Sequence, residues 1–516
     1  MADIKREIER KYESDDSGLP DLTGVAGVAD VIDKGLVELD ATYYDTQDER
    51  LASAHITLRR RTGGSDEGWH LKFPVSEGVR DEIHAPLSDA VPRVLTGLIR
   101  SRVRNAGLRP EVRLRTARDI RHLVDADGTL LAEVSVDAVR AERLTGDGGE
   151  VQWTELEVEL ADDGDPAFLD KVEKRLRKAG VRPAKAPSKL ARALAETTPG
   201  GKKARKAKAS AAAEAEAAAA AAEPSEPVTA GDHVLAYLRT QRDAIVGLDP
   251  AVRRDEYDSV HRMRVAARRM RSVLHSYGKV LDRTVTDPVS EELRWLGGEL
   301  GVDRDQEVLA ERIAAAVGRL PRTLVTGPIR NRLRIWGNAR RSGSRRRLIA
   351  VLDGRRYLTL LDVLDALIAE PPWLDKASGD PAKVIGKAVR KDYGRLASLV
   401  DQAIDLPPGH DRDLALHEAR KKAKRTRYAA ESAVPALGDP AATLVKSAKS
   451  LQNLLGEHQD SVMARGAIRD IAAQAHAAGE SAFTYGLLYG REESSAAGYE
   501  AELPGLWASV REKTDL

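Results

Sequence analysis

Charged side chains alternate with apolar ones in many short segments of the first part of the chain. In the segment "EIERK", Glu7, Glu9 and Lys11 alternate with Ile8 and Arg10. Side chains two apart on a β-strand lie on the same face, so the first three charges would share one face of a strand. The same spacing recurs in Arg59 and Arg61, His70 and Lys72, Arg80 and Glu82, Arg113 and Arg115, Glu133 and Asp137, and Glu155, Glu157 and Glu159.

These faces carry both signs of charge, which indicates a ligand that needs both. If the apolar faces pack against helices, the charged faces point inward, where they must be paired, hydrated or bound to an ion. Arginine and lysine would bind phosphate oxygens, and carboxylates are the hard ligands that Mg²⁺ and Mn²⁺ prefer. Such a metal would lower the pKa of a bound water and neutralise a leaving phosphate. An exposed sheet with cross-strand ion pairs is the alternative interpretation.

Two basic stretches in the second half of the chain share one pattern. "HRMRVAARRMR" (261–271) and "HEARKKAKRTR" (417–427) align residue for residue, and each is followed by Leu-x-x-x-Leu-Gly-x-x-x-Asp, at 296–305 and 451–460. This is an internal duplication. The aligned pairs are His261 and His417, Arg264 and Arg420, Arg268 and Lys424, Arg269 and Arg425, and Arg271 and Arg427.

On a helix, the first, fourth, eighth and eleventh positions of these stretches form one stripe about 80° wide. The first stretch contains five arginines and no acid, and the second contains six basic residues and only Glu418. Such repulsion indicates a bound polyanion, unless acids of other helices, such as Asp305 and Asp460, balance it. Nucleic acid is disfavoured because readers of single strands interleave aromatic residues, and only Tyr428 lies nearby. We therefore expect a phosphate chain without bases.

The elements that would position these residues fall into two halves. Alternating segments with Gly and Asp turns, and two helical segments near 91–106 and 166–179, predict a mostly antiparallel α+β domain. The stretch 199–227 lacks large apolar residues and is typical of a flexible tether. Beyond it, helical spacing predicts about ten helices packed as bundles. We expect domains at 1–198 and 229–516, joined by a linker at 199–228.

Composition limits the class of protein. Charged residues make up 32% of 516 residues, but the net charge is only +1, so the chain as a whole has no bias toward nucleic acid or membranes. The absence of cysteine excludes disulfides and thiolate chemistry. The sequence shows neither a secretory signal nor an apolar run of about 18 residues, so we expect a cytoplasmic protein with no membrane partner.

The first 195 or so residues resemble the CYTH superfamily, the triphosphate tunnel metalloenzymes. The resemblance rests on an ordered set of motifs: "EIERK", "YYDT", "TLRRR", "WHLKFP", "RDE", "TELEVEL" and "SKLARAL". It implies an eight-stranded antiparallel β tunnel that hydrolyses a terminal phosphoanhydride with a divalent metal, although a few members cyclise ATP. Arg115 and Glu159 share the parity of their neighbours, so the choice between neighbouring candidates stays open. The resemblance implies metal-ligand roles for Glu7, Glu9, Glu155 and Glu157, with Asp137 nearby, and phosphate contacts for Lys11, Arg59, Arg61, Lys72, Arg113 and Lys189.

The second half, from about residue 229, resembles CHAD, the conserved histidine α-helical domain. This resemblance implies two pseudo-symmetric four-helix bundles with basic helices facing a central cavity that binds inorganic polyphosphate. Each histidine would either contact phosphate when protonated or make a structural hydrogen bond at a helix start, and both interpretations stay open. The expected polyphosphate-binding residues are His261, Arg264, Arg268, Arg269, Arg271, Lys391, Arg395, His417, Arg420, Lys421, Lys424 and Arg427.

The sequence therefore predicts a metal-dependent hydrolase of inorganic triphosphate, with Mg²⁺ or Mn²⁺ as cofactor, that is tethered to a polyphosphate-binding module. The helical half would recruit the enzyme to polyphosphate granules or supply it with phosphate chains, and the sequence does not choose between the two. A non-catalytic polyphosphate-binding protein and a class IV adenylate cyclase remain the alternatives.

Overall fold

The computed structural model describes residues 3–14, 18–146, 148–197, 227–301, 304–341 and 344–514, without the side chains of residues 3, 304–307, 338–341 and 344. The predicted linker lies almost wholly outside these residues, as does the side chain of Asp305. The chain forms two compact units that divide near residue 220, and each is described by itself. The exact domain limits stay a prediction.

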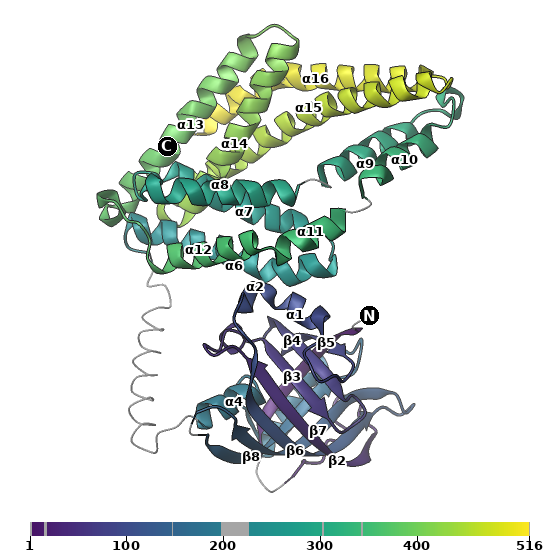
Figure 1. Ribbon diagram of the computed structural model, residues 1–516, viewed down its shortest axis with the longest axis vertical. Coiled ribbons are helices and arrows are strands. Elements are labelled where there is room, and N and C mark those ends of the chain that lie inside the picture. Colours follow the sequence, from purple (N-terminus) through teal and green to yellow (C-terminus); the bar gives the residue numbers. More distant parts are fainter. Residues whose placement is uncertain are drawn as a thin grey trace. The chain divides into compact units, whose positions relative to one another are not determined.

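The first unit is a closed antiparallel β-barrel (Figure 1). Neighbouring strands follow the order β5-β4-β3-β2-β6-β7-β8-β1, and pairing of β1 with β5 closes the ring, while the short β9 adds to β1 outside it. This confirms the predicted eight-stranded tunnel. The strands are β1 (Asp3–Glu13), β2 (Asp30–Asp45), β3 (Thr57–Thr62), β4 (Gly68–Ser76), β5 (Val79–Ala85), β6 (Arg109–Val124), β7 (Leu130–Arg143), β8 (Glu150–Leu160) and β9 (Arg182–Pro183).

Two groups of helices cover the outside of the barrel. Helix α3 (Ala167–Lys178) packs Leu169 and Val172 against Val158 of β8, and α1 (Arg93–Leu98) and α2 (Arg100–Val103) cover Leu58 and Leu71 of β3 and β4. The apolar face of these strands therefore points outward. Because strand side chains alternate, the charged face of the same strands must point into the barrel.

One end of the barrel is filled by helix α4 (Lys189–Glu196). Its Leu190 and Ala193 pack with Val112, Leu114 and other buried residues of β2, β6, β7 and β8. The Ser188 hydroxyl caps the helix by accepting a hydrogen bond from the Ala191 N–H at 3.1 Å. At this end, then, apolar side chains point inward.

The second unit is helical, as predicted (Figure 1). Helix α7 packs between α6 and α8, and α12 contacts both α6 and α8. In a similar way α14 packs between α13 and α15, and α16 packs against α15. The duplicated stretches lie on α7 and α14, which also pack against each other. The helices are α6 (Ala230–Arg254), α7 (Ser259–Ser276), α8 (Arg283–Glu299), α9 (Arg304–Gly318), α10 (Ile329–Arg341), α11 (Ser344–Asp353), α12 (Arg355–Ala369), α13 (Pro381–Asp405), α14 (His410–Leu437), α15 (Asp439–Ala477) and α16 (Phe483–Lys513).

Among the described residues, no helix combines the length and the apolar character needed to cross a bilayer.

Leu71 tests the outward apolar face, because it is fully buried under α1 and α2. We expect Leu71→Ala to lower the free energy of unfolding of the barrel by about 2–5 kcal/mol, since it leaves a cavity in a packed core. Hydrogen exchange of β3–β5 peptides in rising urea measures this change. Leu36→Ala on β2, where the side chain is 66% exposed, is the matched control and should change the same quantity by less than about 0.5 kcal/mol. Equal losses for both variants would contradict the assignment.

Candidate functional site

The bore of the barrel is a cavity of about 650 Å³ lined mainly by charged side chains. Strands β1 to β8 and the start of α4 all contribute to its lining. Of the residues predicted from the sequence, the lining contains Glu7, Glu9, Lys11, Arg59, Arg61, Lys72, Glu157 and Lys189. Asp137 and Glu155 are buried beside them, in contact with Lys189.

The deeper charged group consists of Asp137, Glu155 and Glu157 with two cations. Lys189 Nζ lies 2.8 Å from Asp137 Oδ2 and 2.7 Å from an oxygen of each glutamate. Arg118 donates to both oxygens of Asp137, at 2.8 and 2.7 Å, and to Glu157 at 2.8 Å. Burial alone would raise the pKa of Asp137, but Lys189 and Arg118 outweigh burial and lower it. Burial is likewise outweighed at Glu157, where Lys11, Lys189 and Arg118 lower the pKa, so Asp137 and Glu157 are ionised at neutral pH.

A second charged group lies on β1, β4 and β5. Lys72 Nζ donates to Glu7 Oε2 at 2.5 Å and lies 3.6 Å from Glu82 Oε1, which is also 2.7 Å from His70 Nδ1 and 3.7 Å from Arg59 Nη2. Burial raises the pKa of Glu7 to about 8, although Lys72 opposes the shift. Glu82 shares the same surroundings, but the attraction of its cations outweighs burial and holds its pKa well below the usual range.

Lys11 connects the charged residues of β1 to the deeper group. Its ammonium lies 3.1 Å from Glu9 and also contacts Glu157. Burial alone would lower the pKa of Lys11, but these two carboxylates outweigh burial and raise it. The structure therefore brings the acids of β1 and β8 together through a shared cation.

Arg61 lies in the bore without full compensation of its charge. Its guanidinium contacts Asp66, whose side chain is 55% exposed. Burial and repulsion from Arg59 and Arg118 lower the pKa of Arg61 to about 9. A bound anion would relieve this repulsion.

Arg113 does not face the bore, so its assignment to the tunnel face is wrong. Its side chain is 39% exposed and donates to Asp40 on the outside of the barrel, and Arg115 lies near the same carboxylate. At the end that α4 fills, the apolar side chains of Val112 and Leu114 point inward, so Arg113 between them points outward. The basic residue that β6 contributes to the bore is Arg118.

Several bore residues were not among the predicted site residues, and Arg118 and Glu82 are the two that contact predicted ones most closely. Arg118 lies in "RTARDIRH", where polar side chains occur at both parities, so the sequence alone does not show which ones face inward. Glu82 was singled out by its spacing with Arg80, and the ordered "RDE" motif was the available signal.

In the helical unit, four cations of the duplicated stretches converge between α7 and α14. Burial, followed by repulsion from Arg420, Arg268 and Arg264, lowers the pKa of Lys424 to about 7. Arg268 also donates to the Tyr428 hydroxyl at 2.8 Å. We call Arg264, Arg268, Arg420 and Lys424 the cationic cluster. It contains two residues from each copy of the repeat.

The second duplicated motif supports this cluster. The guanidinium of Arg264 lies so close to Gly301 that a Cβ there would come within 2.7 Å of Arg264 Cζ. In the other copy Arg420 packs near Gly456 and lies 3.8 Å from Asp460. The glycine of each Leu-Gly motif thus leaves room for the arginine of the matching basic helix.

The remaining predicted polyphosphate-binding residues lie in other surroundings. Arg269 and Arg427 both pair with Glu431, and Lys421 pairs with Glu418 on the exposed surface. These three cations therefore have carboxylate partners already.

The other members of that set are distributed around α7, α13 and α14. His417 Nδ1 lies 2.6 Å from Gln459 Oε1, and burial lowers the pKa of this histidine. Burial, Arg425 and Arg294 lower the pKa of Arg271. His261, Lys391 and Arg395 are exposed.

Comparison with known proteins decides the family. A model of the CYTH domain matches residues 5–194, and a model of the CHAD domain matches residues 236–469. The uncharacterized protein Rv2226 of Mycobacterium tuberculosis is 39% identical over an alignment of 531 residues, which covers 99% of this chain and 98% of that protein. The chain belongs to the CYTH–CHAD family. The resemblance seen in the sequence is thereby confirmed.

Two solved structures are similar to the CHAD half. PptA from Streptomyces chartreusis is 22% identical, with a TM-score of 0.47, over 55% of this chain and 99% of that one. The CHAD domain from the plant Ricinus communis is also 22% identical, with a TM-score of 0.43, over 55% of this chain and 92% of that one.

The donor set of the CYTH bore fits a divalent metal. The oxygens that Asp137, Glu155 and Glu157 offer lie within 4.8 Å of one another, and all three residues are buried. Glu155 Oε1 has no partner with hydrogen-bond geometry among the described residues, although Lys189 Nζ lies 2.7 Å away. A buried carboxylate oxygen in this state suits a hard cation such as Mg²⁺ or Mn²⁺.

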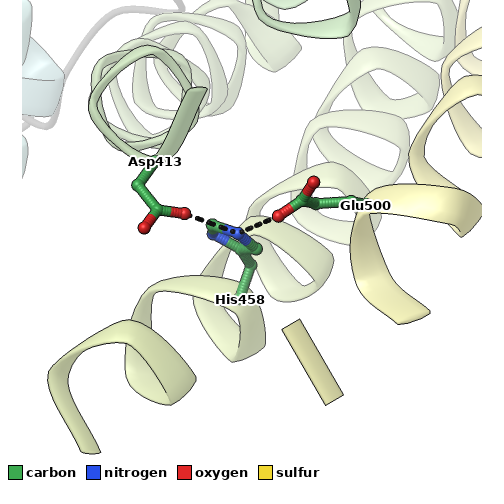
Figure 2. A group of neighbouring side chains, drawn as sticks. All are labelled: Asp413, His458 and Glu500. Carbon is green, nitrogen blue, oxygen red and sulfur yellow. Dashed lines mark hydrogen bonds and ion pairs between the residues drawn. The ribbon is translucent and has the colours of Figure 1, made fainter. Parts of the chain in front are cut away.

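A second acidic group in the CHAD domain is of a different kind. Figure 2 shows His458 between Asp413 and Glu500, with Nε2 at 3.3 Å and 3.2 Å from their oxygens. Arg465 lies 3.1 Å from the other Asp413 oxygen, and Arg412 lies 3.2 Å from the other Glu500 oxygen. Because each carboxylate already has an arginine, we interpret this group as a structural link between α14, α15 and α16.

Lys424 tests the electrostatics of the cationic cluster. Its pKa falls from an ordinary value of about 10.4 to about 7 on folding, so the unfolded chain binds more protons between these pH values. The CHAD domain is therefore destabilised by Lys424 most strongly at and below pH 7, and this cost diminishes as the pH rises toward 10. We expect Lys424→Met to raise the unfolding temperature by several degrees at pH 7 and by less at pH 9.

Calorimetry over this pH range measures the effect. Lys421→Met removes an exposed lysine of the same helix and should change the unfolding temperature little at any pH. A difference between wild type and Lys424→Met that does not depend on pH would contradict the assigned pKa.

Proposed function

We propose that the CYTH domain hydrolyses inorganic triphosphate with Mg²⁺ or Mn²⁺, and that the CHAD domain binds inorganic polyphosphate. CYTH domains typically act on triphosphates. The observation that carries the proposal is the lining of the bore, in which buried carboxylates and cations face one another within a closed barrel. Anion binding alone needs the cations but gains nothing from Glu9, Asp137, Glu155 and Glu157.

In the strand order, the cations that would bind phosphate lie across the bore from the carboxylates that would hold the metal. Strands β3 and β4 provide Arg59, Arg61 and Lys72, and β7 and β8 provide Asp137, Glu155 and Glu157, which lie three to four strands away in the ring of eight. The phosphates would lie against the first wall, where arginine binds phosphate oxygens in bidentate fashion. The carboxylates of the second wall would hold the metal.

When bound, the metal would neutralise charge on the phosphates and make water more acidic. The chain's own residues prepare the site for this chemistry. Lys11, Arg118 and Lys189 hold Glu157 in its ionised form, and the walls keep the reacting phosphate away from bulk water. Arg59 and Lys72 would hold the phosphate chain in place, which supports attack in line with the bond that breaks.

The lining favours inorganic triphosphate over a nucleotide. Among the lining residues, Tyr43 is the one large aromatic side chain, and its hydroxyl accepts a hydrogen bond from Arg59 at 3.2 Å. A ring held in this way offers no free platform for stacking an adenine base. Charged groups therefore dominate recognition.

The cationic cluster supports the assignment of polyphosphate to the CHAD domain. Burial, followed by repulsion from neighbouring arginines, lowers the pKa of Lys424, and a linear polyanion would relieve the repulsion. A bound chain would keep the enzyme at polyphosphate granules.

A substrate panel on the full chain tests the activity. We expect phosphate release from triphosphate with Mg²⁺ or Mn²⁺, at a higher kcat/KM than from long polyphosphate, ATP or thiamine triphosphate. Loss of release in Glu9→Ala would assign the activity to the bore. No turnover of any compound would leave a binding protein, and cyclic AMP formed from ATP would identify a cyclase.

Arg61 and Arg113 form a matched pair for the direction of the charged faces. Arg61 faces the bore under repulsion from other arginines, whereas Arg113 lies outside with Asp40. We expect Arg61→Gln to lower kcat/KM for triphosphate by about 10- to 100-fold without loss of stability, because the mutation removes a group that binds phosphate and relieves repulsion. Arg113→Gln should stay within about twofold. Steady-state kinetics with thermal unfolding as a control measures both, and equal effects would contradict the assignment.

The cationic cluster can be tested against arginines of the same two helices. We expect Arg268→Gln with Arg420→Gln to weaken polyphosphate binding and to lower the salt dependence of log Kd by about one unit for each phosphate that the protein no longer neutralises. The control is Arg269→Gln with Arg427→Gln, which removes the same charge from α7 and α14 but affects residues already paired with Glu431. Fluorescence titration at several salt concentrations measures both. A larger loss of affinity in the control would reject the cluster as the binding site.

A further inference from the structure

Lys189 lies where a metal ion held by the deeper carboxylates would lie. Its ammonium is 2.7–2.8 Å from an oxygen of each of Asp137, Glu155 and Glu157. The side chain is 10% exposed and comes from the first residue of α4, not from a barrel strand. Three carboxylates from two strands thus share one cation that belongs to a separate element.

The site suits a metal better than it suits the ammonium. Glu155 Oε1 is buried and close to Lys189, yet it lacks a partner with hydrogen-bond geometry in the described part of the chain. Ligand oxygens of a six-coordinate Mg²⁺, at about 2.1 Å from the ion, lie about 3 to 4 Å apart. The three acids offer oxygens within 4.8 Å of one another, so only small movements would convert this site to metal ligation.

Charge balance prevents the ammonium and a metal from sharing the site. Asp137 and the two glutamates are already matched by Lys189, Arg118 and Lys11. Lys11 also pairs with Glu9, so the group holds four carboxylates and three cations, and a divalent ion would leave one uncompensated positive charge in a buried place, which is costly. Departure of Lys189 removes this excess charge.

We propose that Lys189 and the divalent metal occupy the site of Asp137, Glu155 and Glu157 in turn, so that metal entry releases Lys189 to bind the phosphates of the substrate. This inference rests on the proposed function and adds an order of binding to it. Lys189 is a positioning residue that holds the three carboxylates together until the metal binds. Metal and substrate then bind with positive coupling, because each favours the state in which Lys189 has left the carboxylates.

The fold allows this exchange without loss of the barrel. Helix α4 is anchored by Leu190 and Ala193 in the apolar cluster and by Arg192, whose guanidinium lies 4.9 Å from the centre of the Trp153 ring. Lys189 begins the helix, so its long side chain can leave the carboxylates while these anchors stay. The movement needed is a change of rotamer with a small shift of the first turn.

Binding of Mn²⁺ to the full chain in the absence of substrate tests the exchange. We expect Lys189→Met, which keeps the length of the side chain and removes its charge, to bind Mn²⁺ at least tenfold more tightly than wild type in calorimetric titration. Arg113→Met is the matched control, because it removes one charge from the outside of the same barrel, at a residue that pairs with Asp40. This control should bind Mn²⁺ as wild type does. Unchanged or weaker binding by Lys189→Met, or no Mn²⁺ binding by either protein, overturns the inference.

Hydrogen exchange on wild type gives a second readout that needs no variant. Addition of Mn²⁺ should speed exchange in peptides that cover the start of α4 while the β7 and β8 peptides become more protected. Slower exchange at the start of α4, or unchanged protection of the β7 and β8 peptides, would overturn the inference. Tighter Mn²⁺ binding by Lys189→Met, together with no hydrolysis of any triphosphate by wild type, would keep this inference and reject the proposed activity, so the two failures are distinguishable.

Discussion

A closed antiparallel barrel sends every second side chain of every strand into one enclosed space, and much of this structure follows from that geometry. Helices α1, α2 and α3 take the apolar side of their strands, so the charged side has no route to bulk solvent except through the bore. Enclosed charges must then compensate one another. The contacts of Lys11, Lys72, Arg118 and Lys189 with buried carboxylates are this compensation. The same groups would exchange these partners for metal and phosphate.

The side chains that share one face of a strand in the site could be predicted from the sequence, because strand side chains alternate with a period of two residues. Glu7, Glu9, Arg59 and Lys72 follow that period on strands whose other face carries apolar residues such as Ile8, Leu58 and Leu71. The prediction for Arg113 was wrong because it assumed that apolar residues always point outward, whereas α4 fills one end of the barrel with apolar contacts. No local sequence pattern indicates which end of a strand will pack against a helix that lies much later in the chain.

The helical half shows a similar limit. The duplication identified the basic stripe, but a stripe does not show which of its cations already have partners. Arg427 and Glu431 are four residues apart on one helix, so this pairing was visible in the sequence. The pairing of Arg269 with Glu431 required α7 and α14 to pack together, and only the structure shows it. What remains is the cationic cluster, whose like charges destabilise the fold and which we propose to bind a polyanion.

The helix that fills one end of the barrel also decides how a long chain can enter. With Leu190 and Ala193 packed across that end, a linear polymer cannot thread through the barrel and must be inserted by its terminus. Internal linkages of the polymer would then stay outside, beyond the reach of the carboxylates. The closed end would thereby limit how many phosphate units of a chain terminus can lie beside the acids.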